Sequence, residues 1–290
     1  MKVFITGSES FIGKELIRQC EKAGIDVVGV DVVENPKPNL YKKDLRDHDL
    51  SDFIPEQVDA IVHLAALSRD SDCVNNAYDC FDINVMGTLN LIKAAQKRKA
   101  KQFIFASSEW VYDFTSGEEK YEDSVIDLAS HTSEYALSKL VSEANLRQQY
   151  NHDFCPVTIL RFGIIYGPRK HNWSAVESIL NAAKTNKSVT VGSVKTSRYF
   201  IHVTDIARGI LKSIGLEGFH IINLQGSECI PLGDIVSVGD KFLNQSTVII
   251  EKDPQNYNIR KVSNKKAKEL IGFESEISFE DGLRTLIDKL

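Results

Sequence analysis

The first 31 residues carry the pattern that most restricts how this chain can fold. A short apolar run, Lys2–Thr6, is followed by Gly7, then by an amphipathic stretch over Phe11–Ala23, then by a second apolar run that ends at Asp31. Apolar runs rich in β-branched residues indicate buried strands, and the stretch between them has helical spacing. Strand, glycine turn, helix, strand and acid is the order that a dinucleotide-binding unit requires. The pattern therefore predicts an α/β chain with a cofactor at its N-terminal turn.

Four positions of this unit have separate roles in the predicted site. Gly7 permits the tight turn, Gly13 lets the helix pack closely on the strand, and the helix N-terminus faces the pyrophosphate. Asp31 would accept hydrogen bonds from the adenosine ribose and repel a 2′-phosphate, which predicts NAD rather than NADP. Ser10 stands where a middle glycine is expected. Either its Cβ pushes the cofactor outward, or its hydroxyl donates a hydrogen bond to a phosphate oxygen.

A second pattern, in the middle of the chain, indicates acid–base chemistry. Tyr135 and Lys139 stand four residues apart, and a Ser107-Ser108 pair lies upstream. Positions i and i+4 share one face of a helix, so the Lys139 ammonium can approach the Tyr135 phenol. A nearby cation favours phenolate and lowers a tyrosine pKa from its usual value of about 10, so Tyr135 is a candidate general base. An exposed Tyr and Lys on an ordinary helix have the same spacing, and the pattern gains weight only beside the N-terminal unit.

Taken together, the motifs resemble the extended short-chain dehydrogenase/reductase family, and within it the nucleotide-sugar epimerases and dehydratases of the UDP-glucose 4-epimerase type. The resemblance runs from Met1 to about Leu290. It rests on seven motifs in order: Thr6-Gly7-x-x-Ser10-x-x-Gly13, Asp44-Leu45-Arg46-Asp47, His63-Leu64-Ala65-Ala66, Asn84 within Asp82–Thr88, Ser107-Ser108-Glu109-Trp110-Val111-Tyr112, Arg161–Arg169 and Arg198–Asp205. It implies a Rossmann-type, doubly wound parallel sheet with a smaller C-terminal substrate-binding lobe.

The resemblance also implies a role for each predicted site residue. Tyr135 takes a proton from a sugar hydroxyl, Lys139 holds the tyrosine ionised and contacts the nicotinamide ribose, and Ser108 hydrogen-bonds the reacting oxygen. The implied NAD contacts come from Gly7, Ser10, Phe11, Ile12, Gly13, Asp31, Asp44, Leu45, Leu64, Ala65, Ala66, Tyr135 and Lys139. The implied contacts to a nucleotide-diphosphate sugar come from Ser108, Glu109, Arg198 and Arg260. Arg198 is the first candidate for the diphosphate, because a guanidinium binds phosphate through two parallel hydrogen bonds.

The reaction type remains open within this family. An epimerase, which oxidises a sugar hydroxyl to a ketone and returns the hydride to the other face, is favoured. Dehydratases commonly place Asp-Glu directly after the catalytic residue, whereas this chain has Glu109-Trp110, and an indole cannot transfer protons. A 4-keto reductase would usually prefer NADPH, which Asp31 disfavours. The alternative from another class is a non-catalytic NAD-sensing protein, and the presence of Ser108, Tyr135 and Lys139 together argues against it.

Composition is consistent with a cytoplasmic enzyme. The 290-residue chain has a net charge of −5 and no apolar run that approaches the ~18 residues of a membrane span, so we expect neither a nucleic-acid partner nor a membrane. The cysteines are dispersed without a Cys-x-x-Cys pair, which predicts reduced thiols and no metal centre: Cys20, Cys73, Cys80, Cys155 and Cys229. The resemblance alone implies a homodimer, paired through the helices expected at about Tyr78–Lys99 and Glu134–Tyr150.

The order of the remaining elements predicts a division into domains. Strands expected at about Ala60–His63, Gln102–Ala106, Val157–Phe162 and Phe219–Asn223 alternate with helices, and this alternation is typical of a parallel sheet covered on both faces. Thr204 is expected to cap a helix through Leu216. Further helices are expected near Leu232–Leu243 and Asn264–Ile271. The NAD-binding domain is predicted at 1–162 plus about 202–223, and the substrate lobe at about 163–201 plus 224–290.

Overall fold

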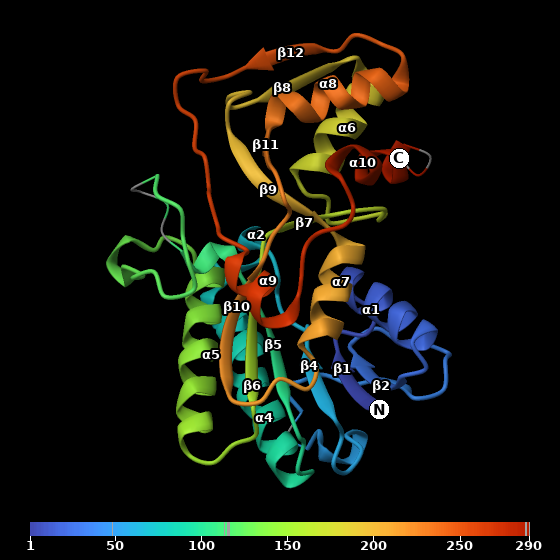
Figure 1. The fold of residues 1–290 in the computed structure, drawn as a ribbon, viewed down its shortest axis with the longest axis vertical. Coiled ribbons are helices and arrows are strands. Elements are labelled where there is room, and N and C mark those ends of the chain that lie inside the picture. Colours follow the sequence, from blue (N-terminus) through green and yellow to red (C-terminus); the bar gives the residue numbers. More distant parts are fainter. Residues whose placement is uncertain (48, 113, 115–116, 288, 290) are drawn as a thin grey trace. The chain divides into compact units, whose positions relative to one another are not determined.

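The structure, a computed structural model, describes residues 1–47, 49–112, 114, 117–287 and 289 and forms two compact units (Figure 1). The first unit comprises Met1–Asp113, Ser124–Arg161 and Ala207–Ile222. The second unit comprises Phe114–Asp123, Phe162–Ile206 and Asn223–Leu290. The assignment of one unit to NAD and the other to substrate stays a prediction.

A seven-stranded parallel sheet lies at the centre of the first unit, in the order β10-β6-β5-β4-β1-β2-β3 (Figure 1). Its strands are β1 (Lys2–Thr6), β2 (Asp26–Asp31), β3 (Leu40–Lys42), β4 (Ala60–His63), β5 (Phe103–Ser108), β6 (Val157–Phe162) and β10 (Phe219–Leu224). Strand β1 pairs with β2 on one side and β4 on the other, so the strand order reverses at the end of β1. Ligands of such sheets bind beyond the carboxyl ends of the strands at this reversal. The predicted fold class is confirmed.

Helices flank this sheet, and one of them differs from the prediction. They are α1 (Phe11–Lys22), α2 (Asp70–Cys73), α3 (Ala77–Phe81), α4 (Gly87–Lys97), α5 (Glu134–Asn151) and α7 (Val203–Ser213), with short 3-10 turns at Ser51–Phe53, Glu109–Val111 and Leu128–Ser130. The single helix expected at about Tyr78–Lys99 is interrupted by a π-helical segment, Asp82–Met86. Such segments are rare within helices and often mark functional positions.

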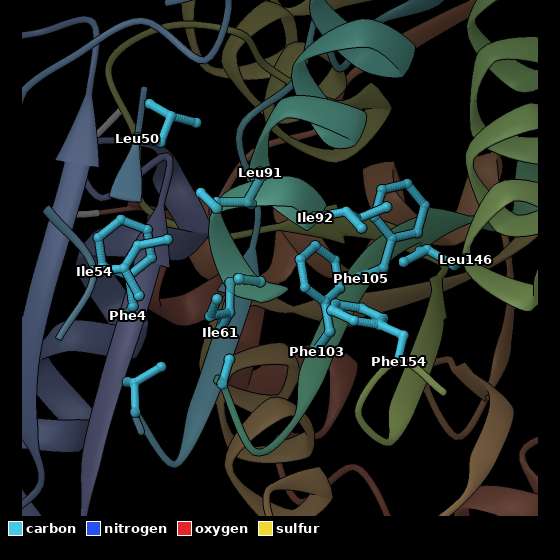
Figure 2. Close-up of a cluster of buried hydrophobic side chains, with 14 of the residues drawn as sticks. Phe4, Leu50, Ile54, Ile61, Leu91, Ile92, Phe103, Phe105, Leu146 and Phe154 are labelled. Atoms are coloured by element: carbon cyan, nitrogen blue, oxygen red, sulfur yellow. The ribbon is translucent and has the colours of Figure 1, made fainter. Parts of the chain in front are cut away.

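The core of the first unit explains why β1, β4 and β5 read as almost continuous apolar runs. These strands are buried on both faces, as central strands of a covered parallel sheet are. Figure 2 shows Phe4 of β1, Ile61 of β4 and Phe103 of β5 in one cluster with Leu91 of α4 and Leu146 of α5, and all of these side chains are fully buried. Helices α4 and α5 therefore pack on the sheet through the apolar side chains of this cluster.

The second unit has two small sheets and its own core. One sheet has the order β11-β9-β7 and the other pairs β12 with β8, from strands β7 (Ile164–Tyr166), β8 (Ser188–Val191), β9 (Ser197–His202), β11 (Cys229–Pro231) and β12 (Val248–Glu251). Its helices are α6 (Ala175–Asn186), α8 (Leu232–Leu243), α9 (Lys265–Ile271) and α10 (Phe279–Ile287). The buried side chains of Tyr166, Leu180, Ile235 and Leu283 meet in its core.

One predicted cap is wrong. Helix α7 begins at Val203 rather than after Thr204. The His202 ring accepts a hydrogen bond from the backbone N–H of Thr204, 3.3 Å from Nδ1. His202 therefore does what Thr204 was expected to do, and Thr204 lies inside the first turn. Within the described residues, no helix combines the length and apolar character that crossing a membrane requires.

Candidate active site

The glycine turn after β1 is close-packed in a way that only glycine permits. Gly7 has a φ of +73°, and a Cβ placed on it would lie 2.8 Å from the backbone nitrogen of Ala65. A Cβ on Gly13 would lie 2.1 Å from the carbonyl oxygen of Gly7. The backbone N–H of Gly7 donates to the carbonyl of Val30, 2.9 Å away, which ties the turn to β2. Turn, helix and strands thus meet at the strand-order reversal, with the N-terminus of α1 directed at the space where a pyrophosphate is expected.

Ser10 has a structural task in this turn. Its Oγ accepts a hydrogen bond from the backbone N–H of Gly13, 3.0 Å away, so Ser10 is the N-cap of α1. Serine is among the preferred residues at this position because its oxygen satisfies one of the unpaired N–H groups of the first turn. A hydroxyl that accepts in this way can still donate its own hydrogen, so the second reading of Ser10, a phosphate donor, is compatible with the geometry.

Asp31 is held in place by the backbone beside it. Its Oδ2 accepts from the backbone N–H of Glu9 at 2.9 Å, and its Oδ1 accepts from that of Val33 at 3.0 Å. Each carboxylate oxygen has more than one lone pair, so both can accept further hydrogen bonds from ribose hydroxyls. The acid at the end of β2 is therefore fixed against the glycine turn.

Asp44 and Leu45 lie in the loop after β3. The Asp44 carboxylate binds the Arg46 guanidinium, with Nη2 to Oδ2 at 2.6 Å. This hydrogen bond lowers the pKa of Asp44 from its ordinary value. Leu45 is buried, and its carbonyl accepts from Asn90 Nδ2 on α4 at 3.0 Å. The expected approach of Asp44 to an adenine therefore involves a carboxylate that is already paired with a cation.

His63, at the end of β4, is part of a buried relay that the motif pattern did not reveal. Its Nδ1 lies 2.7 Å from Thr6 Oγ1 and its Nε2 lies 2.9 Å from Thr88 Oγ1. Thr88 donates its own hydrogen to the Asn84 carbonyl at 2.6 Å, so it accepts from Nε2–H of His63. Burial lowers the pKa of His63 to about 3, so the ring is neutral at neutral pH. These hydrogen bonds fix the end of β4, and just after the strand the Ala65 N–H also donates to Thr6 Oγ1 at 3.3 Å.

The predicted catalytic side chains are brought together in the first unit. The Tyr135 phenol and the Ser108 hydroxyl lie near enough to influence each other, and Ser108 Oγ accepts from the backbone N–H of Trp110 at 3.2 Å. Lys139 lies one turn after Tyr135 on α5, with its ammonium 5.9 Å from the centre of the Tyr135 ring. Its Nζ donates to the carbonyl of Ala106 at 2.8 Å, so it is anchored to β5. All three side chains are buried.

The expected pKa of Tyr135 needs a correction. Burial raises it to about 12, and the influence of the neighbouring Ser108 hydroxyl offsets this only in part. Burial also lowers the pKa of Lys139 to about 8. The Lys139 ammonium is directed at a backbone carbonyl of β5, and desolvation of the phenolate outweighs the attraction that the spacing suggested. In the chain by itself Tyr135 is therefore a protonated phenol at neutral pH.

Asn84 connects the π-helical segment to the helix that carries Tyr135. Its amide accepts from Leu67 N at 2.8 Å and donates to Leu67 O at 3.0 Å. The same amide donates to Ser138 Oγ at 3.0 Å, and Ser138 in turn donates to the carbonyl of Tyr135 at 2.7 Å. The resemblance implied a structural Asn here, and these bonds show what it holds: the loop after β4 against α5.

A buried charge network lies directly behind Ser108. Ser107 Oγ donates to Glu143 Oε1 at 2.5 Å, and Arg161 donates to both oxygens of Glu143, at 3.0 Å from Nε and 2.6 Å from Nη2. Arg161 Nη1 also donates to the Tyr112 hydroxyl at 2.9 Å. The segment that carries Ser108 is thus fixed at both ends. Sequence reasoning missed this role of Glu143, although its place four residues after Lys139 puts it on the same helix face.

Glu109 and Trp110 differ in burial. Glu109 is 1% exposed, whereas Trp110 is 36% exposed. A carboxylate next to Ser108 is therefore withdrawn from water, while the indole lies at the surface of its unit.

The predicted phosphate-binding arginines both lie in the second unit. Arg198 of β9 donates from Nη1 to the carbonyls of Ser197 and Asn258, at 2.8 and 2.7 Å. The Arg260 guanidinium lies 4.9 Å from the centre of the Phe114 ring. These contacts orient both side chains. The N–H groups of a guanidinium are suited to donate hydrogen bonds to the oxygens of a diphosphate. Among the described residues, no group of three or more His, Cys, Asp and Glu side chains could hold a metal ion.

Comparison with known proteins gives the family. A family model described as the NAD dependent epimerase/dehydratase family matches residues 3–224. The chain belongs to this family. The predicted family and its cofactor, NAD, are thereby confirmed.

Relatives within the NAD dependent epimerase/dehydratase family match nearly the whole chain. An uncharacterized UDP-glucose epimerase, YtcB of Bacillus subtilis (strain 168), is 27% identical over 98% of this chain and 96% of its own length. A UDP-glucuronate 4-epimerase of Thermodesulfobacterium geofontis (strain OPF15) is 26% identical over 98% of this chain and 94% of its own. The solved structure of a UDP-glucuronic acid 4-epimerase from Bacillus cereus, in complex with UDP-glucuronic acid and NAD, is 26% identical with a TM-score of 0.86 and covers 100% of this chain and 98% of that one.

The residues at the strand-order reversal fit the family's cofactor. A cradle that a Cβ at Gly7 or Gly13 would fill, a capped helix N-terminus and a fixed carboxylate at Asp31 are what a dinucleotide needs. The residues that would hold NAD are those of the glycine turn, Asp31 and the chain after β4. NAD bound there would supply the hydride acceptor.

Proposed function

We propose that the chain is an NAD-dependent UDP-sugar 4-epimerase. The observation that carries the proposal is the buried cluster of Ser108, Tyr135 and Lys139, in which the Lys139 ammonium lies 5.9 Å from the centre of the Tyr135 ring. The names of the relatives supply the substrate class, since those compared above are UDP-glucose or UDP-glucuronate epimerases. Ser108, Tyr135 and Lys139 are what the oxidation of a sugar hydroxyl requires.

In this proposal Tyr135 is the proton-transfer group. The Ser108 hydroxyl, which lies near the phenol, would donate a hydrogen bond to the sugar oxygen, while Tyr135, once ionised, takes the proton of the reacting hydroxyl. Because burial raises the pKa of Tyr135 to about 12, positive charge brought into the site is needed before the phenol gives up its proton. Lys139 is a buried cation of the site itself, with its ammonium 5.9 Å from the centre of the Tyr135 ring.

The 4,6-dehydratase alternative has one specific observation in its favour. Glu109 is 1% exposed and follows Ser108 directly, so it is a carboxyl group withdrawn from water at the site. Elimination of water also needs a second acid–base group, and Trp110 in the next position cannot serve. We therefore place the epimerase first, and we assign Glu109 to shaping the sugar pocket.

NMR of the sugar protons separates these functions. The purified chain with NAD is incubated with UDP-glucose, UDP-glucuronate and a panel of GDP-, CDP- and dTDP-sugars. Interconversion of two C4 stereoisomers without net cofactor reduction is expected for a UDP-sugar. A 4-keto-6-deoxy product would establish the dehydratase instead. Silence across the panel, with NAD bound, would contradict both and favour a 4-keto reductase or an NAD-sensing protein.

We further propose a cytoplasmic homodimer. Five free cysteines support a reducing compartment. The pairing would use α4 and α5, which are joined by a hydrogen bond from Gln96 Nε2 to Gln149 Oε1 at 3.1 Å and lie side by side (Figure 1). Sedimentation at micromolar concentration tests the dimer, and a monomer there would contradict it.

A further inference from the structure

The glycine turn holds a carboxylate that the family resemblance leaves without a role. Glu9 lies between the Gly7 turn and the Ser10 cap, and its side chain is only 10% exposed. Its Oε1 accepts from Asn35 Nδ2, and its Oε2 lies 3.1 Å from the Lys14 ammonium. Glu9 is therefore fixed from two sides rather than extended into solvent.

Glu9 is also directly connected to the predicted ribose-binding acid. Its backbone N–H donates to Asp31 Oδ2 at 2.9 Å. The bond makes Glu9 the residue of the turn that borders Asp31, and Asn35, which binds the Glu9 carboxylate, follows Asp31 in the chain. An adenosine ribose that reaches Asp31 therefore arrives beside the backbone of Glu9, whose side chain is a second carboxylate.

Asp31 by itself gives incomplete protection against a 2′-phosphate. Both of its oxygens accept backbone N–H groups, and such bonds spread and partly neutralise the carboxylate charge. A 2′-phosphate carries about −1.5 to −2 charges at neutral pH, and it would gain from a nearby ammonium such as that of Lys14. The Lys14 side chain is 63% exposed, and its ammonium is paired with Glu9. Glu9 thus adds one negative charge near the ribose site. By pairing with the Lys14 ammonium, it also keeps that cation from binding a 2′-phosphate.

We propose that Glu9 is a specificity-determining residue that excludes 2′-phosphorylated dinucleotides from this site. The proposal rests on the assignment of Asp31 to the adenosine ribose in the proposed function. Glu9 acts by repelling the phosphate and by holding Lys14 away from it, and it leaves the binding of NAD itself almost unaffected.

The test is a binding measurement that needs no sugar nucleotide. Dissociation constants for NADH and NADPH are measured by titration of the full chain, followed by dinucleotide fluorescence. Glu9→Gln, which keeps the size and the hydrogen-bonding groups, is expected to tighten NADPH about tenfold and to change NADH less than about twofold. The gain should shrink at high salt, because the charges are partly exposed. A ratio of the two constants that stays unchanged in Glu9→Gln would overturn the proposal.

Two further variants locate the effect. Lys14→Gln in the wild-type background is expected to weaken NADPH further, because it leaves the Glu9 carboxylate without its ammonium. The double variant Glu9→Gln/Lys14→Gln is expected to keep part of the gain, since the repulsion is gone; a complete loss of the gain would overturn repulsion by Glu9 as a cause.

Asp31→Asn separates this proposal from the one on which it rests. It should weaken NADH and relax the discrimination. If it does so while Glu9→Gln changes nothing, the ribose site stands and the role of Glu9 is refuted. If Asp31→Asn leaves both dinucleotides unaffected, the cofactor assignment fails as well.

Discussion

Glu143 and Arg161 form a buried two-point ion pair, with Nη2 2.6 Å from Oε2 and Nε 3.0 Å from Oε1. The two side chains are 7% and 4% exposed. The pair joins α5, which carries Tyr135, to β6, and it binds Ser107 at the end of β5. Its two charges compensate each other where water is excluded, so loss of either partner leaves an uncompensated charge in the interior.

The first prediction concerns this pair. Glu143→Gln should lower the free energy of unfolding by about 3–5 kcal/mol, because the Arg161 charge would remain buried without its partner. Urea denaturation of the purified variants measures this. The double variant Glu143→Leu/Arg161→Met should recover much of the loss, since it removes both charges. Lys101→Met, which breaks the exposed pair with Asp59 at 2.7 Å, serves as control and should cost under about 1 kcal/mol. Equal losses in the buried and exposed variants would contradict this account.

Tyr135→Phe should leave NAD binding intact and reduce turnover about 10²- to 10⁴-fold, because only the proton-transfer group is lost. Turnover is followed by sugar NMR, and NAD affinity by titration. Tyr41→Phe on β3 removes an exposed hydroxyl of the same kind and should change neither quantity. Undiminished turnover in Tyr135→Phe would refute the catalytic assignment.

His63 should make the fold sensitive to acid. Its pKa is lowered by burial to about 3 in the folded chain, against an ordinary 6.5, so between these values the unfolded chain binds a proton that the folded chain does not. Stability therefore falls as the pH drops below 6.5, by about 2 kcal/mol at pH 5 from this residue. Urea denaturation at pH 7 and pH 5 measures the loss. The variant His63→Gln should lose about 2 kcal/mol less than the wild type over the same interval; identical losses would show that His63 is not responsible.

Gly13→Ala should disrupt the glycine turn. The added Cβ would lie 2.1 Å from the carbonyl oxygen of Gly7, so backbone must move, at a cost of about 1–3 kcal/mol. NAD affinity should fall with it, since the turn no longer has its shape. Gly192→Ala is the matched control, because among the described residues no atom beyond its chain neighbours lies within 4 Å of its added Cβ, and it should change stability by under about 0.5 kcal/mol. A Gly13→Ala chain with normal NAD affinity would contradict the cofactor role of the turn.

Arg198→Ala should raise the Michaelis constant for the sugar nucleotide about tenfold or more and change turnover much less, because a charge-assisted hydrogen bond contributes about 1.5–3 kcal/mol to binding. Steady-state kinetics of the epimerisation measures both. Arg198→Lys should give an intermediate constant, since an ammonium keeps the charge but loses the two-point geometry. An unchanged constant in Arg198→Ala would remove Arg198 from the diphosphate.

The sequence predicted best where one physical cause dominates. Strands β4 and β6 were predicted with the bounds that they have, Ala60–His63 and Val157–Phe162, because a strand buried on both faces is apolar throughout. Helix α8 was predicted equally well at Leu232–Leu243. The strands of the second unit escaped prediction, because strands such as β8 are only partly buried and lack a continuous apolar run that would distinguish them from loops.

For the candidate site, sequence spacing predicted which residues lie close together, but not the pKa values of their side chains. The i, i+4 relation correctly placed Tyr135 and Lys139 on one face of α5. The pKa of Tyr135 could not be predicted from the sequence, because it depends on how far the surrounding fold removes the phenol from water. It also depends on the Lys139 ammonium, which donates a hydrogen bond to the Ala106 carbonyl. The partners of Glu143 and His63 come from distant parts of the chain, and no local pattern reveals such pairs.

The π-helical segment Asp82–Met86 has a consequence for how this chain can change over evolutionary time. A π turn contains an extra residue, so α3 and α4 are rotated relative to each other compared with one unbroken helix. Deleting a single residue here would restore regular winding and swing one half by about 100°. Asn84 could then no longer face Leu67 and Ser138 together. Substitutions can therefore accumulate along this helix, whereas deletions at the π turn would not be tolerated.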